Sequence, residues 1–267
     1  IYHNPRKKIS IQLGDGQLIS NILNKKLIYN FRQNDLLHNG QGAPLAPIYH
    51  KYIIEDLDLT LPCCILNIGG ISNYTYCFND TLAAKDIGPG NVLMDEYLKK
   101  TKGIDYDKNG DIASSGNINK DIINQFYEHE FYNVQQKHSF DRNEFDFSFV
   151  KGLEFEDAVA TLTYFTALII SQNIKKNFDN EIEIILCGGG RRNLALVNHI
   201  KKLLKYKIKL IDEFSVDGDF IESQAFAYLS IRSYLNKIIS YPSTTNVLNP
   251  VTAVSYTHLT LPTMMSV

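Results

Sequence analysis

The sequence predicts an α/β fold, because buried-type strands alternate with amphipathic helices along most of the 267 residues. Residues 63–68 form the continuous apolar run of a buried strand, and residues 73–78 alternate apolar and polar side chains. Residues 154–176 instead repeat apolar side chains every three or four positions, as an amphipathic helix does. In folds of this class, ligands bind at the carboxyl ends of the strands.

The other elements continue this alternation. The predicted strands cover residues 9–13, 26–29, 63–68, 73–78, 82–85, 183–187 and 207–211. The predicted helices cover residues 17–23, 91–101, 118–131, 154–176, 193–204 and 221–235. We divide the chain into residues 1–60, residues 61–250 and a tail of residues 251–267, whose pattern departs from the rest and which we expect not to belong to the native fold.

Composition excludes several classes of protein. The hydrophobic content of 44% and charged content of 21% are those of an ordinary globular protein. A net charge of -2 removes the strongest argument for a nucleic-acid partner, and the longest apolar stretch, residues 158–170, is shorter than the roughly 20 residues of a membrane span. The cysteines and histidines lack zinc-type spacing. We therefore expect a cytoplasmic protein with no metal site of its own and no nucleic-acid or membrane partner.

Three glycine-bearing loops follow predicted strands, at residues 67–73, 86–91 and 187–193. Glycine lets backbone N–H groups approach a ligand such as a phosphate closely, although a tight turn would explain any one loop taken singly. The two common nucleotide motifs are absent: there is no GxxxxGK[ST], and the GPG of residues 88–90 is followed by Leu93 where GxGxxG has its third glycine. Walker-type and Rossmann-type proteins are therefore disfavoured.

Four ordered motifs resemble those of the anhydro-N-acetylmuramic acid kinase family. They are HNGQGAPLAP at residues 38–47, LNIGGISN at residues 66–73, DIGPGNVLMD at residues 86–95 and CGGGRRN at residues 187–193. The resemblance extends over about residues 2–250 and implies a two-lobed actin-like ATPase (ribonuclease H-like) fold with ATP between the lobes. Residues 1–60 would then be the remainder of an incomplete first lobe, and residues 61–250 the C-terminal lobe with the nucleotide loops.

The resemblance implies an ATP-dependent kinase of cell-wall sugar recycling. Such a kinase hydrolyses the 1,6-anhydro ring of anhydro-N-acetylmuramic acid and phosphorylates O6, which gives N-acetylmuramic acid 6-phosphate. Asp86 matches the aspartate of the family's DxGPGN motif and would be the general base that takes a proton from the attacking water. The alternative for Asp86 is a cap of the helix that begins near residue 91. The implied cofactors are ATP and Mg²⁺ carried by the nucleotide, and a homodimer is compatible with the family.

Further site residues carry over by the same matches. The implied sugar-binding residues are Arg32, Asp35, Gly40, Gln41 and Glu222. The implied ATP-binding residues are Asn67, Gly69, Gly70, Gly88, Gly90, Gly188, Gly189, Gly190 and Asn193. The sequence departs from the family at Asn30 and Asn34, where the family has an aspartate and a basic residue.

The family's first phosphate loop, Gly-Thr-Ser-x-Asp-Gly-x-Asp, would precede residue 1. We therefore expect the chain as given to bind ATP poorly and to turn over slowly or not at all, since phosphoryl transfer depends on positioning and electrostatics. Two other interpretations remain open: another sugar kinase or acyl-phosphate-forming kinase of the same fold, and a non-catalytic carbohydrate-binding or partner-binding relic.

Overall fold

The computed structural model describes residues 2–135, 145–178, 182–252 and 255–256, which form two compact units. Unit 1 comprises Ile1–His50 and Glu222–Val267, and unit 2 comprises Lys51–Ile221. Unit 1 is therefore discontinuous in sequence. This division groups residues 222–250 with the N-terminal segment, whereas the sequence analysis placed them in the second segment.

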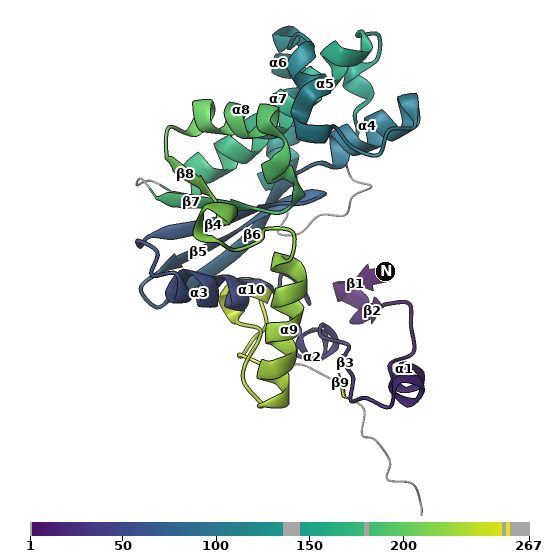
Figure 1. Ribbon diagram of the computed structural model, residues 1–267, viewed down its shortest axis with the longest axis vertical. Helices are drawn as coiled ribbons and strands as arrows, with labels where there is room; N and C mark the ends of the chain where they lie inside the picture. The colour runs from purple at the N-terminus through teal and green to yellow at the C-terminus, as the bar shows by residue number, and fades with distance from the viewer. Residues whose placement is uncertain (1, 136–144, 179–181, 253–254, 257–267) are drawn as a thin grey trace, which may run out of the picture. The chain divides into compact units, whose positions relative to one another are not determined.

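Unit 2 is built on a mixed five-stranded sheet (Figure 1). Its strands, in the spatial order β6-β5-β4-β7-β8, are Thr81–Pro89, Ile71–Phe78, Cys63–Ile68, Glu183–Cys187 and Lys207–Leu210. The β4, β5 and β6 strands form an antiparallel meander, while β4, β7 and β8 run parallel. The predicted α/β class is confirmed, and the predicted strands of residues 63–68 and 73–78 correspond to the antiparallel pair β4 and β5.

The helices α4 to α8 of unit 2 lie on one side of this sheet, as Figure 1 shows, and α5 packs on α7 and α8 instead of on the strands. They are α4 (Val92–Lys102), α5 (Asp111–Ser115), α6 (Lys120–Gln135), α7 (Phe155–Asn177) and α8 (Leu194–Leu204), with short 3₁₀ turns η2 (Lys108–Gly110), η4 (Ser148–Val150), η5 (Gly189–Arg192) and η6 (Ile211–Phe214). The predicted helix of residues 154–176 is α7, whose Phe165 is 2% exposed and packs in the same core as Leu66 and Leu186. Its buried Thr163 hydroxyl donates to the Val159 carbonyl at 2.8 Å, so the polar group costs little inside the core.

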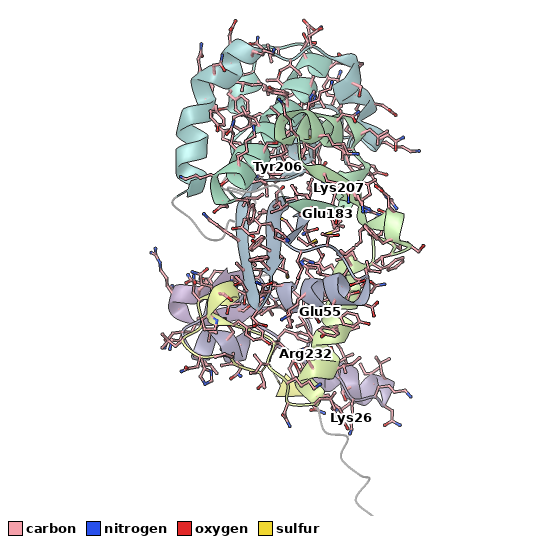
Figure 2. The ribbon with its side chains drawn as sticks, turned by 90° about the vertical axis from the view of Figure 1, so that its left-hand side faces the viewer. Lys26, Glu55, Glu183, Tyr206, Lys207 and Arg232 are labelled. Carbon is pink, nitrogen blue, oxygen red and sulfur yellow. The ribbon has the colours of Figure 1, made fainter. Side chains whose placement is uncertain are left out.

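The amino ends of β7 and β8 carry a charge cluster (Figure 2). The Glu183 carboxylate forms ion pairs with the Lys207 ammonium at 3.0 Å and the Lys209 ammonium at 2.8 Å. The Glu183 side chain is 7% exposed. These ion pairs hold the two parallel strands in register at the end opposite the glycine loops.

Unit 1 is assembled from short elements. They are β1 (Tyr2–Asn4), η1 (Pro5–Lys7), β2 (Ile9–Ile11), α1 (Gly16–Leu23), β3 (Ile28–Tyr29), α2 (Gln33–Leu37), α10 (Pro242–Thr245) and β9 (Ser255–Tyr256), with α3 (Pro47–Asp56) and α9 (Ile221–Tyr234) running across the unit boundary. β1 pairs with β2, and β3 pairs with β9. Within the expected tail, Val251 bridges to Ser240 and β9 joins β3, whereas residues 253–254 and 257–267 lie outside the described residues. None of the described helices combines the length and apolar character that a membrane span requires.

Candidate functional site

The turn between β4 and β5 is tied to the start of α4. The Gly69 carbonyl accepts the Asn91 N–H at 2.7 Å, and the Gly70 carbonyl accepts the N–H groups of Gly90 at 2.9 Å and Val92 at 3.2 Å. The Gly69 carbonyl and the Gly70 N–H belong to the same trans peptide and point in opposite directions. Because the Gly69 carbonyl points toward the start of α4, the Gly70 N–H points away from it. The turn therefore has fixed carbonyls on one side and backbone donors on the other.

Two of the predicted glycines are required by close packing between loops. A Cβ on Gly90 would lie 2.2 Å from the Gly69 carbonyl oxygen. Gly188 has a φ of 77° and a ψ of 170°, and a Cβ there would lie 2.4 Å from Asn67 Oδ1. Both distances are too short for any side chain. The structure thus brings the three predicted glycine loops together at one end of the sheet.

Gly69 and Gly189 differ from these two. The nearest protein atom to a Cβ on Gly69 would be 3.6 Å away, and on Gly189 3.7 Å away, which is ordinary van der Waals contact. Neither residue has a positive φ. Neither packing nor backbone conformation therefore explains glycine at these positions.

A row of polar side chains crosses the sheet beside these loops. Asp86 on β6 is paired with Asn73 on β5, Asn73 with Asn67 on β4, and Asn67 with Cys187 on β7. Residues directly opposite each other on neighbouring strands share a face of the sheet. Four strands thus place an aspartate, two asparagines and a thiol on the face opposite the α7 core.

Asn67 connects two of the glycine loops through its amide. The Cys187 thiol donates to Asn67 Oδ1 over 3.7 Å, and burial raises the pKa of this thiol to about 12, which keeps it neutral. The Nδ2 atom of the same amide is the side nearer to Gly69. Asn67 therefore offers its donor side to the β4–β5 turn while its oxygen faces the loop after β7.

Asp86 lies next to an irregularity in β6. Ser72 pairs with Gly88 and Asn73 pairs with Asp86, so Ile87 is one residue extra in β6 and forms a β-bulge. Bulges re-aim neighbouring side chains and are frequent beside active sites. The N-cap position of α4 is Asn91, whose side chain forms no capping hydrogen bond, so Asp86, which lies within β6, is not the N-cap residue of this helix.

Asn193 has a structural hydrogen bond of its own. Its side-chain oxygen accepts the Leu196 N–H at 3.0 Å at the N-cap of α8, and the residue is 7% exposed. Its oxygen thus stabilises the first turn of α8. The ATP contact expected for Asn193 remains a prediction.

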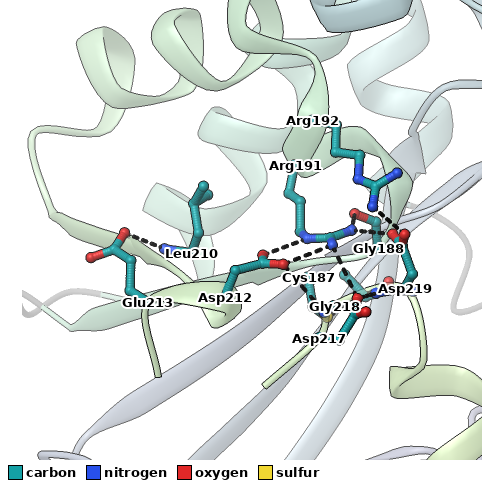
Figure 3. A network of polar contacts seen from close by, with 11 residues as sticks. Cys187, Gly188, Arg191, Arg192, Leu210, Asp212, Glu213, Asp217, Gly218 and Asp219 are labelled. Atoms are coloured by element: carbon teal, nitrogen blue, oxygen red, sulfur yellow. Dashed lines mark hydrogen bonds and ion pairs between the residues drawn. The ribbon is translucent and has the colours of Figure 1, made fainter. Parts of the chain in front are cut away.

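A buried arginine beside Gly188 was not among the predicted site residues. Arg191 is bound along one edge by Asp212 in a bidentate pair, with Nε–Oδ2 at 2.6 Å and Nη2–Oδ1 at 2.9 Å. Its Nη1 also reaches Asp219 Oδ1 at 2.8 Å and the Gly188 carbonyl at 3.1 Å (Figure 3). The guanidinium lowers the pKa of Asp212 to about 2, and the carboxylates raise the pKa of Arg191. The CGGGRRN motif marks this segment but does not distinguish Arg191 from Arg192.

The predicted sugar-binding residues belong to unit 1, where Asp35 is the centre of a buried hydrogen-bond network. Asp35 is 1% exposed and accepts the Gly42 N–H and the Thr245 hydroxyl, each at 2.5 Å. A Cβ on Gly40 would lie 2.1 Å from Asp35 Oδ1. Asp35 and Gly40 therefore shape the loop of residues 38–42.

Arg32, Gln41 and Glu222 lie around the same loop or on the adjoining helix. Arg32 Nη1 donates to the Gly42 carbonyl at 2.6 Å, and the Gln41 N–H donates to the Thr245 carbonyl at 2.7 Å. Glu222 is exposed in the first turn of α9, four residues before Phe226, whose ring meets that of Phe31 with centroids 5.2 Å apart. Residues four apart share a helix face, so Glu222 is on the face of α9 that packs toward Phe31.

Comparisons with known proteins agree on one family. The family model described as anhydro-N-acetylmuramic acid kinase matches residues 1–256. The anhydro-N-acetylmuramic acid kinase of Pelagibacter ubique is 50% identical over 261 residues, which cover 94% of this chain and 69% of the relative. The enzyme of the same name from Zymomonas mobilis is 36% identical, with coverage of 94% and 69%.

Solved structures are more distant. Component A of the Acidaminococcus fermentans (R)-2-hydroxyglutaryl-CoA dehydratase is 13% identical, with a TM-score of 0.44 over 72% of this chain and 68% of that chain. The sequence matches extend over nearly the whole chain and include the four motifs and the loops described above. By these matches, the chain belongs to the anhydro-N-acetylmuramic acid kinase family.

Proposed function

We propose that this chain acts in the ATP-dependent phosphorylation of anhydro-N-acetylmuramic acid, with opening of the 1,6-anhydro ring and formation of N-acetylmuramic acid 6-phosphate. Such a reaction serves the recycling of cell-wall sugar. The relatives that carry this enzyme name cover 94% of the chain, at up to 50% identity. We also propose a cytoplasmic location, where ATP is available.

The observation that carries the proposal is the free space beside the backbone of Gly69 and Gly189. The protein leaves room for a side chain at both positions, and neither has a backbone conformation that favours glycine. Backbone N–H groups that a phosphate or an adenosine can approach closely explain both residues. In this proposal the β4–β5 turn binds the phosphates, and the loop of residues 188–190 binds the adenosine. In the same proposal Asn67, Gly70, Gly88 and Gly90 are ATP-binding residues, and the hydrogen bonds of Gly70 and the close packing of Gly90 hold the β4–β5 turn against the start of α4.

Bound Mg²⁺-ATP supplies the phosphoryl group, and its metal neutralises charge on the phosphates. Among the described residues, no group of three or more His, Cys, Asp or Glu side chains is arranged to hold a metal ion. We propose that Mg²⁺ is carried by the nucleotide, whose phosphates the backbone N–H groups of the glycine loops could bind.

Asp86 is the proposed general base. It is half-buried at the bulge of β6 and shares a sheet face with Asn73 and Asn67. Its carboxylate would accept a proton from the water that attacks the anomeric carbon, a contribution of roughly 10²–10⁴-fold. Arg32, Asp35, Gly40, Gln41 and Glu222 are proposed to form or support the sugar-binding surface, with Asp35 and Gly40 acting through the shape of the loop.

An ADP-release assay with Mg²⁺-ATP and 1,6-anhydro-N-acetylmuramic acid tests the proposal. Because the chain covers 69% of the Pelagibacter relative, the assay uses both the chain alone and the chain joined to the unmatched residues of that relative. The relative itself is the positive control. Asp86→Asn is the test variant, and Asp80→Asn, an exposed carboxylate in the β5–β6 turn, is the matched control.

In the joined form we expect sugar-dependent ADP release that Asp80→Asn retains and Asp86→Asn loses, and in the chain alone we expect little or none. Turnover of Asp86→Asn at the wild-type rate would refute the role of Asp86. If neither form of the chain releases ADP while the relative does, the non-catalytic binding protein becomes the better interpretation.

A further inference from the structure

A buried guanidinium lies next to the proposed adenosine loop. Arg191 is 2% exposed and donates hydrogen bonds to two carboxylates and one backbone carbonyl, and its Nη2 lies 3.8 Å from a third carboxylate, that of Asp217 (Figure 3). A buried charge is tolerated only when its hydrogen-bonding groups are satisfied in good geometry. The arrangement around Arg191 meets this condition and is correspondingly sensitive to change.

The contacts of Arg191 join three separate segments of unit 2. Arg191 itself follows β7, Asp212 lies in η6 directly after β8, and Asp219 lies in the segment before α9. The bidentate pair with Asp212 fixes the plane of the guanidinium. Nη1 is thereby aimed at the Gly188 carbonyl.

This last hydrogen bond sets the orientation of a loop peptide. The Gly188 carbonyl accepts from Nη1 at 3.1 Å and from the Arg191 backbone N–H at 3.3 Å. Since the peptide is planar and trans, fixing this carbonyl also fixes the direction of the Gly189 N–H, on the opposite side. A glycine-rich loop has the most conformational freedom to lose, so such a constraint is needed to keep one orientation.

The backbone of Gly218 lies directly against the Arg191 guanidinium. A Cβ on Gly218 would lie 2.3 Å from Arg191 Nε and 2.5 Å from its Cζ. Gly218 therefore permits the arginine to lie flat against the backbone of the segment before α9. Alanine at this position would displace the guanidinium without changing any charge.

We infer that Arg191 is a positioning residue for nucleotide binding, which holds the loop of residues 188–190 in the conformation that accepts the adenosine of ATP. The inference rests on the proposed kinase function. Arg191 does not need to touch the nucleotide, because its effect passes through the Gly188 carbonyl. Arg192, the adjacent residue of the same type, is 62% exposed and pairs only with Asp219 among the ion pairs of the described residues, so it should not have this role.

The test compares Arg191→Met, Arg191→Lys and Gly218→Ala with the control Arg192→Met. Two readouts are measured: hydrogen exchange of the amides of residues 188–193 without nucleotide, and the affinity for a fluorescent ATP analogue in the joined protein described above. The affinity for the anhydro sugar and the thermal midpoint are measured beside them. A merely structural role would lower the midpoint without separating the two affinities.

We expect Arg191→Met to increase exchange at residues 188–193 and to weaken the nucleotide affinity on the order of tenfold, as for loss of a charged hydrogen bond. Gly218→Ala should act in the same direction. Arg191→Lys should recover part of the affinity, because lysine keeps the charge but cannot form the two-point pair. Arg192→Met should remain within about twofold of wild type.

Unchanged exchange and unchanged nucleotide affinity in folded Arg191→Met would overturn the inference. If Arg191→Met does not fold, the same two outcomes in Arg191→Lys and Gly218→Ala decide it. A wild-type protein that binds no nucleotide in either form would instead refute the proposed function, and the exchange data alone would then decide whether Arg191 orders the loop.

Discussion

Replacing Gly188 by alanine should destabilise unit 2 and disrupt the proposed adenosine loop. The φ of 77° and ψ of 170° at Gly188 fall in a region occupied almost only by glycine, which costs another residue about 1–3 kcal/mol. The added Cβ would also lie 2.4 Å from Asn67 Oδ1 and 2.7 Å from the Ile68 carbonyl oxygen. Shifting the backbone of β4 to relieve this overlap costs about a further 1–3 kcal/mol.

The expected loss in the free energy of unfolding is therefore about 2–6 kcal/mol. Gly103→Ala is the matched control: its φ is 69°, but no atom lies within 4 Å of the added Cβ, so only the backbone cost of about 1–2 kcal/mol applies. The chain has no tryptophan, so far-UV circular dichroism and scanning calorimetry are suitable probes. In a domain of this size the midpoint falls by about 2–4 °C per kcal/mol.

The steric part of this reasoning would be refuted if Gly188→Ala and Gly103→Ala lost the same stability. It would also fail if the nucleotide affinity of folded Gly188→Ala equalled that of wild type, because the overlap involves Asn67, which connects the two loops.

Three further predictions concern stability. Thr245→Val should lower the free energy of unfolding by about 1–3 kcal/mol in urea titrations, since the buried Asp35 carboxylate loses a hydroxyl donor, while Thr245→Ser should retain it. The hydrogen bond from Arg191 lowers the pKa of Asp212 in the folded protein, so the contribution of Asp212 to the free energy of unfolding is present above about pH 4 and is lost as the pH falls toward 2. The urea midpoint of Asp212→Asn should therefore depend less on pH in this range than the midpoint of wild type. Phe165→Ala should cost about 3–5 kcal/mol in calorimetry, and Phe126→Ala, whose side chain is 38% exposed, clearly less.

Local patterns predicted the parts of the fold that depend on neighbours in sequence. The three- and four-residue spacing of residues 154–176 corresponds to α7, and the glycines after residue 68 correspond to the β4–β5 turn. The helix α3 was not predicted, although Pro47 at its first position is a common helix start.

Features that depend on distant partners could not be predicted in this way. Arg191 and Arg192 are identical in type and adjacent, yet they are 2% and 62% exposed, because Asp212 and Asp219 bind one guanidinium inside the fold. The polar row of Asp86, Asn73, Asn67 and Cys187 depends on pairing between β4 and β7, which are more than 100 residues apart. Strand register across such a separation is set by the packed sheet and not by the local sequence.

The discontinuity of unit 1 has a consequence for how the protein is made. The ribosome completes all of unit 2 before it synthesises Thr245, the hydroxyl partner of Asp35, which stands 210 residues later in the chain. At a translation rate of about 5–20 residues per second, Thr245 is synthesised about 10–40 s after Asp35. Late in that interval the nascent chain can contain all five strands of the unit 2 sheet but only the first of the two segments of unit 1. A translation stop after residue 221 would release such a product, with the whole of unit 2 and only the first half of unit 1.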